Sequence, residues 1–183
     1  GMDINMGWPM HKVEDQGSGA GLIRTPEIAK EIVRQSRQGM VDWAVGKVTT
    51  RDLKMSDEIK NWVRKHAKAP KNKEPLPISV KTRIGVSSDV AEEWMETLME
   101  VNPAAISLHG RTLRQLYQGR ADWEAIGRAA TVVHKYGGHI LGNGDIEGVD
   151  DAKLKLDQYI VDGVLIGRAA EGNPEIFLQG SVP

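Results

Sequence analysis

The sequence predicts an α/β protein whose parallel sheet has about five strands alternating with helices. Short apolar runs at residues 3–9, 78–85, 104–112, 139–146 and 162–170 each end at glycine or polar residues. Amphipathic helical patterns lie between most of these runs. The last two runs, with a short helical pattern at 149–156, read as strand, glycine turn, helix and strand, which is the unit of a parallel sheet.

The overall composition is that of one globular domain spanning residues 1–183. The net charge of −1 gives no global attraction to nucleic acid or membrane, so any RNA-binding surface must be local. The chain has no cysteine, which excludes disulfides, thiolate metal sites and thiol nucleophiles, and we predict no metal site. Because we find neither a signal peptide nor an apolar run that could span a bilayer, we expect a cytoplasmic protein without membrane association.

The first elements are a strand at 3–9 that runs into a tight turn, a flexible loop at 17–21, and a helix. Thr25 followed by Pro26 and an acid is a typical helix start. The helix should bury an apolar stripe of Ile28, Ile32 and Val33.

Residues 39–77 form a longer, basic helical connection that ends in a proline-rich loop. Ser56 can cap a second helix, whose apolar face would be Ile59, Trp62, Val63 and His66. Residues 51–73 hold eight Lys or Arg and three acids. These charges fit either a solvated helix face or a local RNA-facing patch.

Two further helices are expected after the second and third strands. Asp89 and Asp122 are their caps. Their buried residues are Val90, Trp94, Leu98 and Val101 in the first, and Trp123, Ile126, Ala130 and Val133 in the second.

The glycine turns after the last two strands predict a phosphate site. Asn143, Gly144 and Asp145 follow one strand, and Gly167 and Arg168 follow the next. Glycines there let backbone N–H groups approach an anion. The alternative is that these glycines only turn a parallel sheet into its helices.

Polar groups occur at all five predicted strand ends. They are Asn5, Lys81 with Arg83, His109 with Arg111, Asn143 with Asp145, and Gly167 with Arg168. A lone Lys is more often an edge charge, and a lone His more often structural. Because chemistry in such sheets sits at the carboxyl ends of the strands, the set together predicts a cationic pocket for a phosphorylated ligand, and flavin mononucleotide (FMN) fits.

Six blocks in order resemble the tRNA-dihydrouridine synthases. They are Asp-Ile-Asn-Met-Gly-Trp-Pro at 3–9, Val-Lys-Thr-Arg at 80–83, Leu-His-Gly-Arg-Thr at 108–112, Asn-Gly-Asp-Ile at 143–146, Ile-Gly-Arg-Ala at 166–169 and Gly-Asn-Pro-Glu-Ile-Phe at 172–177. The resemblance implies an FMN-dependent (β/α)8 barrel that reduces a uridine of tRNA, with NADPH as the electron source. In that family a hydride passes from the flavin to the uracil ring, and a cysteine supplies a proton.

The same resemblance implies a role for each matching residue. Lys81 and His109 would contact the flavin, and Asn5 would lie near the substrate and the isoalloxazine. The ribityl-phosphate end would be held by Asn143, Gly144, Asp145, Gly167 and Arg168.

Two departures from the family pattern qualify the expected activity. Trp8 stands where the family has the cysteine of Gly-Cys-Pro, and tryptophan transfers no proton near neutral pH. We also expect a partial barrel, because the first three strands and the following helical domain of the family are missing. The chain should therefore be inactive toward uridine. The alternatives are a non-catalytic FMN or phosphate binder and a purely structural fragment.

A partial barrel should leave an open sheet face that a partner must cover. We expect this face to include Ile4, Val80, Ile106, Leu141 and Leu165 or their neighbours. The chain is therefore predicted to form a homodimer or a larger assembly through it.

Overall fold

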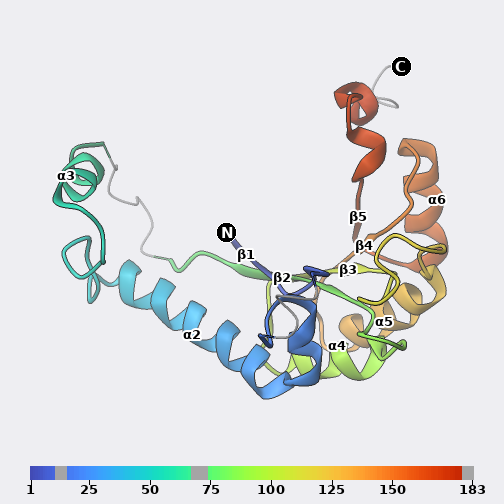
Figure 1. Ribbon diagram of the computed structural model, residues 1–183, viewed down its shortest axis with the longest axis horizontal. Helices are drawn as coiled ribbons and strands as arrows, with labels where there is room; N and C mark the ends of the chain where they lie inside the picture. The colour runs from blue at the N-terminus through green and yellow to red at the C-terminus, as the bar shows by residue number, and fades with distance from the viewer. Residues whose placement is uncertain (11–15, 67–73, 179–183) are drawn as a thin grey trace.

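The computed structural model describes residues 1–10, 16–66 and 74–178. Five parallel strands form one sheet in the order β1-β2-β3-β4-β5, as part of a (β/α)8 barrel would arrange them (Figure 1). The strands are β1 (Met2–Asn5), β2 (Ile78–Arg83), β3 (Ala105–His109), β4 (Ile140–Asn143) and β5 (Gly163–Leu165). The predicted fold class is confirmed, although each strand is shorter than its apolar run because the run continues into the following turn.

Helices connect the strands and pack side by side against one face of the sheet (Figure 1). They are α2 (Pro26–Ala44), α4 (Ala91–Met99), α5 (Trp123–Lys135) and α6 (Val149–Tyr159). Asp122 caps α5 as expected, because its Oδ1 accepts from Ala125 N–H at 2.9 Å. The N-cap of α4 is Val90, and Asp89, one residue earlier, accepts from the first helical N–H, that of Ala91, at 2.9 Å. The chain also forms short 3-10 helices, which are η1 (Gly19–Arg24), η2 (Arg168–Ala170) and η3 (Pro174–Phe177).

The core lies between the helices and the sheet, and this corrects the predicted open face. Val80 and Ile106 are register partners and are fully buried in the helix-side core. Because side chains alternate along a strand, the opposite face carries their neighbours Lys81 and Ser107. The open face is therefore largely polar in its central strands.

This finding removes part of the argument for oligomerisation. Ile4 pairs in register with Val80 and packs with it against the helix-side core. Among the predicted apolar residues, only Leu141 and Leu165, both half-buried, alternate onto the other face. A homodimer or larger assembly stays a prediction, without the apolar interface first expected for it.

Two expectations near the start of α2 are wrong. Residues 19–21 of the predicted flexible loop belong to the 3-10 helix η1 and are buried, because η1 packs on α2 and β2. The Thr25 side chain makes no capping hydrogen bond, although its backbone carbonyl accepts from Ile28 and Ala29 N–H. Of the predicted stripe, Val33 is fully buried and Ile32 packs against the core, whereas Ile28 is exposed. The helix also buries Ala29 and Lys30.

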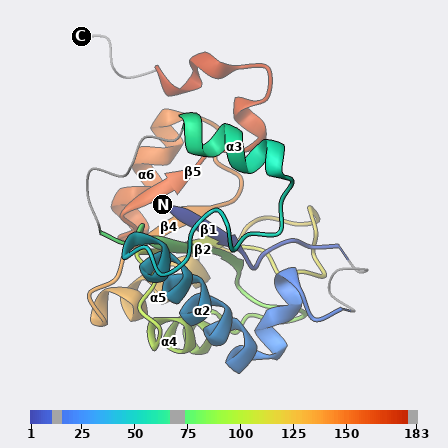
Figure 2. The ribbon, with the colours of Figure 1, turned by 90° about the vertical axis from the view of Figure 1, so that its left-hand side faces the viewer.

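The long connection contains one helix, α3 (Asp57–His66), that extends away from the sheet (Figures 1 and 2). Ser56 caps it weakly, accepting from Ile59 N–H at 3.4 Å. Its predicted apolar face is not buried: Trp62 is 62% exposed and stacks on His66 of the same helix, with ring centroids 4.5 Å apart. The RNA-facing alternative stays a prediction, and residues 67–73 of the basic run lie outside the described residues.

Candidate functional site

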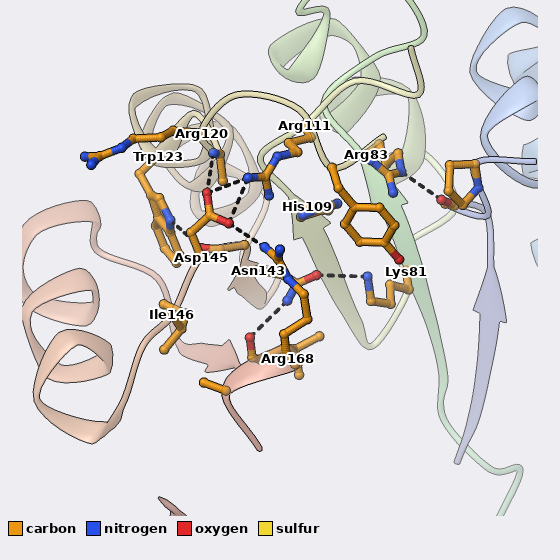
Figure 3. Close-up of a pocket in the computed structure, with 18 of the residues that line it drawn as sticks. Lys81, Arg83, His109, Arg111, Arg120, Trp123, Asn143, Asp145, Ile146 and Arg168 are labelled. Atoms are coloured by element: carbon orange, nitrogen blue, oxygen red, sulfur yellow. Dashed lines mark hydrogen bonds and ion pairs between the residues drawn. The ribbon is translucent and has the colours of Figure 1, made fainter. Parts of the chain in front are cut away.

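A cavity of about 1000 Å³ opens at the carboxyl ends of the strands (Figure 3). Every residue predicted for the site lines it: Asn5, Trp8, Lys81, His109, Asn143, Gly144, Asp145, Gly167 and Arg168. The parallel topology explains this meeting, because it places all strand ends at one edge of the sheet. The volume lies at the upper end of the range for small-molecule and cofactor sites.

Lys81 and Asn143 form the floor of the cavity. Lys81 Nζ donates to Asn143 Oδ1 at 3.1 Å, and Asn143 Nδ2 donates to the Leu165 carbonyl at 2.9 Å. This chain of bonds fixes the amide orientation across β2, β4 and β5. Burial, and then the nearby Arg83, lower the pKa of Lys81, whereas Asp3 raises it. Lys81 thus offers a partly desolvated ammonium group to a ligand.

His109 is buried beside these groups and is held neutral. Burial, followed by the charges of Arg83, Lys81 and Arg111, lowers the pKa of His109 from 6.5 to about 3. A neutral imidazole carries one donor and one acceptor nitrogen, so at neutral pH His109 can hydrogen-bond without adding charge.

The turn after β1 is tied to β2 by Arg83. Its Nε donates to the Gly7 carbonyl at 2.9 Å and its Nη1 to the Thr112 carbonyl at 3.1 Å. Asn5 Oδ1 accepts from Gly7 N–H at 3.0 Å, which closes an Asx turn. The Asn5 carbonyl oxygen is therefore used in the turn, and no described residue accepts a hydrogen bond from its NH₂ group, which is left for a ligand.

Trp8 follows this turn and stands at the rim of the cavity. Its side chain is 50% exposed, and its backbone carbonyl accepts from Ala20 N–H at 3.2 Å. The indole N–H is a donor with no transferable proton near neutral pH. The position can therefore shape the entrance but cannot act as a general acid.

Asp145 joins three strand-end segments. Arg111 Nη2 donates to both of its oxygens at 2.8 and 2.7 Å, Ala121 N–H donates to Oδ2 at 2.8 Å, and Arg168 Nη2 donates to Oδ1 at 2.8 Å (Figure 3). Burial raises the pKa of Asp145, but the Ala121 N–H and the Arg111 guanidinium outweigh it, so the pKa is lowered. Asp145 is therefore a carboxylate at neutral pH.

Gly144 can only be glycine in this conformation. Its φ is +127°, and an added Cβ would lie 2.5 Å from Ala121 Cβ and close to the His109 ring. The Gly144 carbonyl accepts from buried Trp123 Nε1 at 2.9 Å. Gly144 is thus held by close packing on Ala121 and by its hydrogen bond from Trp123, and this places the next residue, Asp145, whose φ is +52°.

The second glycine turn, at Gly167 after β5, has open space beside its backbone that a ligand could enter. An added Cβ at Gly167 would meet nothing within 4 Å. Among the described residues, none accepts a hydrogen bond from the backbone N–H of Gly144 or Gly167. Arg168 follows, 58% exposed, with its guanidinium 5.5 Å from the centroid of the Tyr117 ring.

Sequence reasoning missed the part of the cavity that comes from the loop between β3 and α5 and from α6. These residues are Tyr117, Arg120, Trp123 and Lys155. Trp123 was assigned to the buried face of α5, where it does lie, but its ring also lines the cavity. Arg83 and Arg111 were visible as strand-end cations.

The described ranges hold neither a membrane-crossing helix nor a cluster of metal-binding side chains. Within residues 1–10, 16–66 and 74–178, no helix is both long and apolar enough to cross a membrane. In the same part of the chain, no group of three or more His, Asp or Glu side chains could hold a metal ion.

Comparison with known proteins identifies the family. A family profile described as "Dihydrouridine synthase" matches residues 1–51 and 53–182. The chain is 30% identical over 180 residues to a "Probable tRNA-dihydrouridine synthase" of Staphylococcus epidermidis, covering 97% of this chain and 44% of that protein. A "Probable tRNA-dihydrouridine synthase 2" of Bacillus subtilis is 29% identical over 180 residues, with 97% and 45% covered. The chain spans less than half the length of these relatives, and it belongs to the dihydrouridine synthase family.

Proposed function

We propose that the strand-end cavity binds FMN and that the chain is the flavin-binding part of an oxidoreductase acting on uridine in tRNA. The observation that carries the proposal is the meeting of the Lys81–Asn143 pair with two open glycine turns in one cavity. The names of the relatives supply the tRNA substrate. A cytoplasmic location follows from the proposal, since tRNA is used there.

The floor of the cavity fits the pyrimidine end of a flavin. That end presents carbonyl oxygens and acceptor ring nitrogens, which need hydrogen-bond donors, and one ring N–H, which needs an acceptor. Lys81 supplies an ammonium, Asn143 an amide already oriented by Leu165, and His109 an uncharged imidazole. These groups would hold and orient the ring.

The glycine turns fit the phosphate end. The unused N–H groups of Gly144 and Gly167 and the exposed guanidinium of Arg168 are typical phosphate donors. Buried Arg111 adds positive charge behind them, and its Nη1 has no hydrogen-bond partner among the described residues. Arg111 and Arg168 share the single negative charge of Asp145, so an anion near this end would neutralise the remaining positive charge.

When bound, FMN supplies the hydride for reduction of the uracil ring, with NADPH as the expected electron source. The family pattern places a proton-donating cysteine where this chain has Trp8. General acid catalysis is worth about 10²–10⁴-fold, and no group at that position provides it. We therefore propose that this chain binds FMN but does not reduce uridine at a detectable rate.

A second candidate is a module that binds FMN or phosphate without any redox role, and Trp8 at the entrance is the observation that favours it. A purely structural fragment would need neither the Lys81–Asn143 pair nor the open turns. Neither the flavin-binding part nor this module is expected to change tRNA, and the two differ in whether NADPH reduces FMN that is bound to the chain.

We expect no dihydrouridine when the chain is incubated with FMN, NADPH and unmodified tRNA. The measurement is dihydrouridine content of the digested tRNA by mass spectrometry. The curated Bacillus subtilis relative, assayed in parallel, tests whether the conditions and tRNA support the reaction. Dihydrouridine above the enzyme-free level with this chain would contradict the proposed role of Trp8.

A further inference from the structure

The carboxylate of Asp145 lies at the proposed phosphate end, where a negative charge should repel the ligand. Its oxygens are already occupied by Arg111, Ala121 and Arg168. A carboxylate with these donors has little capacity left for a ligand, and it carries no hydrogen to donate to a phosphate oxygen. Asp145 is therefore unsuited to direct contact with the anion.

Arg111 fixes Asp145 in place. The Arg111 side chain is 3% exposed, and its Nη2 donates both to the Asp145 carboxylate and to the Gly119 carbonyl, the latter at 2.7 Å. Figure 3 shows the Arg111 side chain between Asp145 and His109, and Arg111 also lines the cavity. Charge-assisted contacts to both carboxylate oxygens, made from a buried guanidinium, restrict the orientation of Asp145.

Arg168, by contrast, is exposed and needs support. A flexible guanidinium loses side-chain entropy when it becomes fixed on a ligand. Here Asp145 Oδ1 holds Nη2, and the Tyr117 ring lies beneath the guanidinium at 5.5 Å. The other nitrogens of Arg168 have no hydrogen-bond partner among the described residues.

We propose that Asp145 and Arg111 are positioning residues that orient Arg168 over Tyr117 for the phosphate of the ligand. This inference rests on the proposed FMN site and changes the expected role of Asp145 from a ligand contact to a support. The three charged side chains sum to +1, so the group still attracts an anion.

The change in FMN affinity caused by Asp145→Asn distinguishes positioning of Arg168 from simple charge attraction, because the two effects have opposite signs. Asp145→Asn removes a negative charge next to the phosphate site. If charge alone governed affinity, FMN would bind more tightly to the variant. If Asp145 positions Arg168, FMN should bind more weakly, on the order of tenfold, because a charge-assisted contact to phosphate is no longer pre-oriented.

The test titrates the wild type and Asp145→Asn with FMN, with riboflavin, which lacks the phosphate, and with inorganic phosphate. Flavin fluorescence reports the first two, and calorimetry reports phosphate. We expect Asp145→Asn to weaken FMN and phosphate about tenfold while riboflavin changes less than about twofold. Equal or tighter FMN binding by Asp145→Asn, or an equal loss for riboflavin, would overturn the inference.

A second pair of variants covers the case in which Asp145→Asn does not fold. Tyr117 is exposed, so Tyr117→Leu should fold. It lacks the ring under Arg168, and we expect it to lose more affinity for FMN than for riboflavin. Tyr117→Phe keeps the ring and should bind like the wild type. Unchanged FMN and phosphate affinity in Tyr117→Leu would contradict the support by Tyr117. Failure of the wild type to bind either flavin would instead refute the proposed function, and the phosphate titrations would then still test the positioning of Arg168.

Discussion

Replacement of Gly142 by alanine is expected to lower the free energy of unfolding by about 2–4 kcal/mol. An added Cβ would lie 2.4 Å from the Trp123 ring, which packs directly over β4. The ring cannot move outward without stretching its bond from Nε1 to the Gly144 carbonyl, now 2.9 Å. The substitution therefore adds a steric cost and threatens a buried hydrogen bond at once.

The measurement is chemical or thermal unfolding of both proteins. For a chain of this size the expected loss corresponds to a fall in Tm of roughly 5–15 °C. Gly39→Ala is the matched control, because Gly39 lies within α2 and an added Cβ there meets nothing within 4 Å. That variant should be more stable than the wild type by about 0.5–1 kcal/mol. A Gly142→Ala protein as stable as the wild type would contradict the packing of Trp123 described here.

The second large effect is a loss of stability in weak acid caused by His109. Its folded pKa of about 3 lies below the ordinary value of 6.5, so the unfolded chain takes up a proton first as the pH falls. The stabilising contribution is complete above about pH 6.5 and is lost toward pH 3. The slope should approach 1.4 kcal/mol per pH unit in this window.

Denaturant unfolding between pH 7 and pH 4.5 measures this slope. The charged groups around His109 are Lys81, Arg83, Arg111 and Asp145. The pKa of Asp145 is lowered, so its stabilising contribution is present above the ordinary pKa of an aspartate and is lost at lower pH, when the carboxylate is protonated. His109→Gln, which cannot titrate, should show a clearly smaller slope. An equal slope in His109→Gln would show that His109 is not the group responsible.

The site was more predictable from sequence than the packing around it. Asn143, Gly144 and Gly167 were identifiable because a parallel sheet brings strand ends to one edge and because glycine permits a backbone such as that of Gly144, at φ +127°. His109 and Lys81 were identifiable as polar breaks at the ends of apolar runs. None of this required knowing how the helices pack.

The face of the sheet that the helices cover could not be read from the alternation alone. The pattern in β2 separates Val80 from Lys81, but it does not say which side is the core. The sequence predicts Val80 in the barrel interior, whereas the structure places it in the core under the helices, together with Val33 of α2 and Leu98 of α4.

Helix α3 shows a different limit. Its amphipathic pattern predicted the helix correctly. The buried face predicted with it is absent, because Ile59 and Trp62 pack against no core among the described residues. Periodicity reports the presence of an apolar stripe and carries no information about what meets it. Tyr117, in the loop before α5, was likewise missed because no strand or helix pattern places that loop over the cavity.

The central claim is that the strand-end cavity binds FMN through the Lys81–Asn143 floor, and titration of the chain with FMN tests it most directly. The account predicts saturable one-to-one quenching of flavin fluorescence by the wild type. Lys81→Met should weaken binding by roughly 10–100-fold, because a charge-assisted hydrogen bond is lost. Lys135→Met, at the exposed end of α5, should bind like the wild type. No saturable binding by the wild type, or equal affinity in Lys81→Met, would contradict the account.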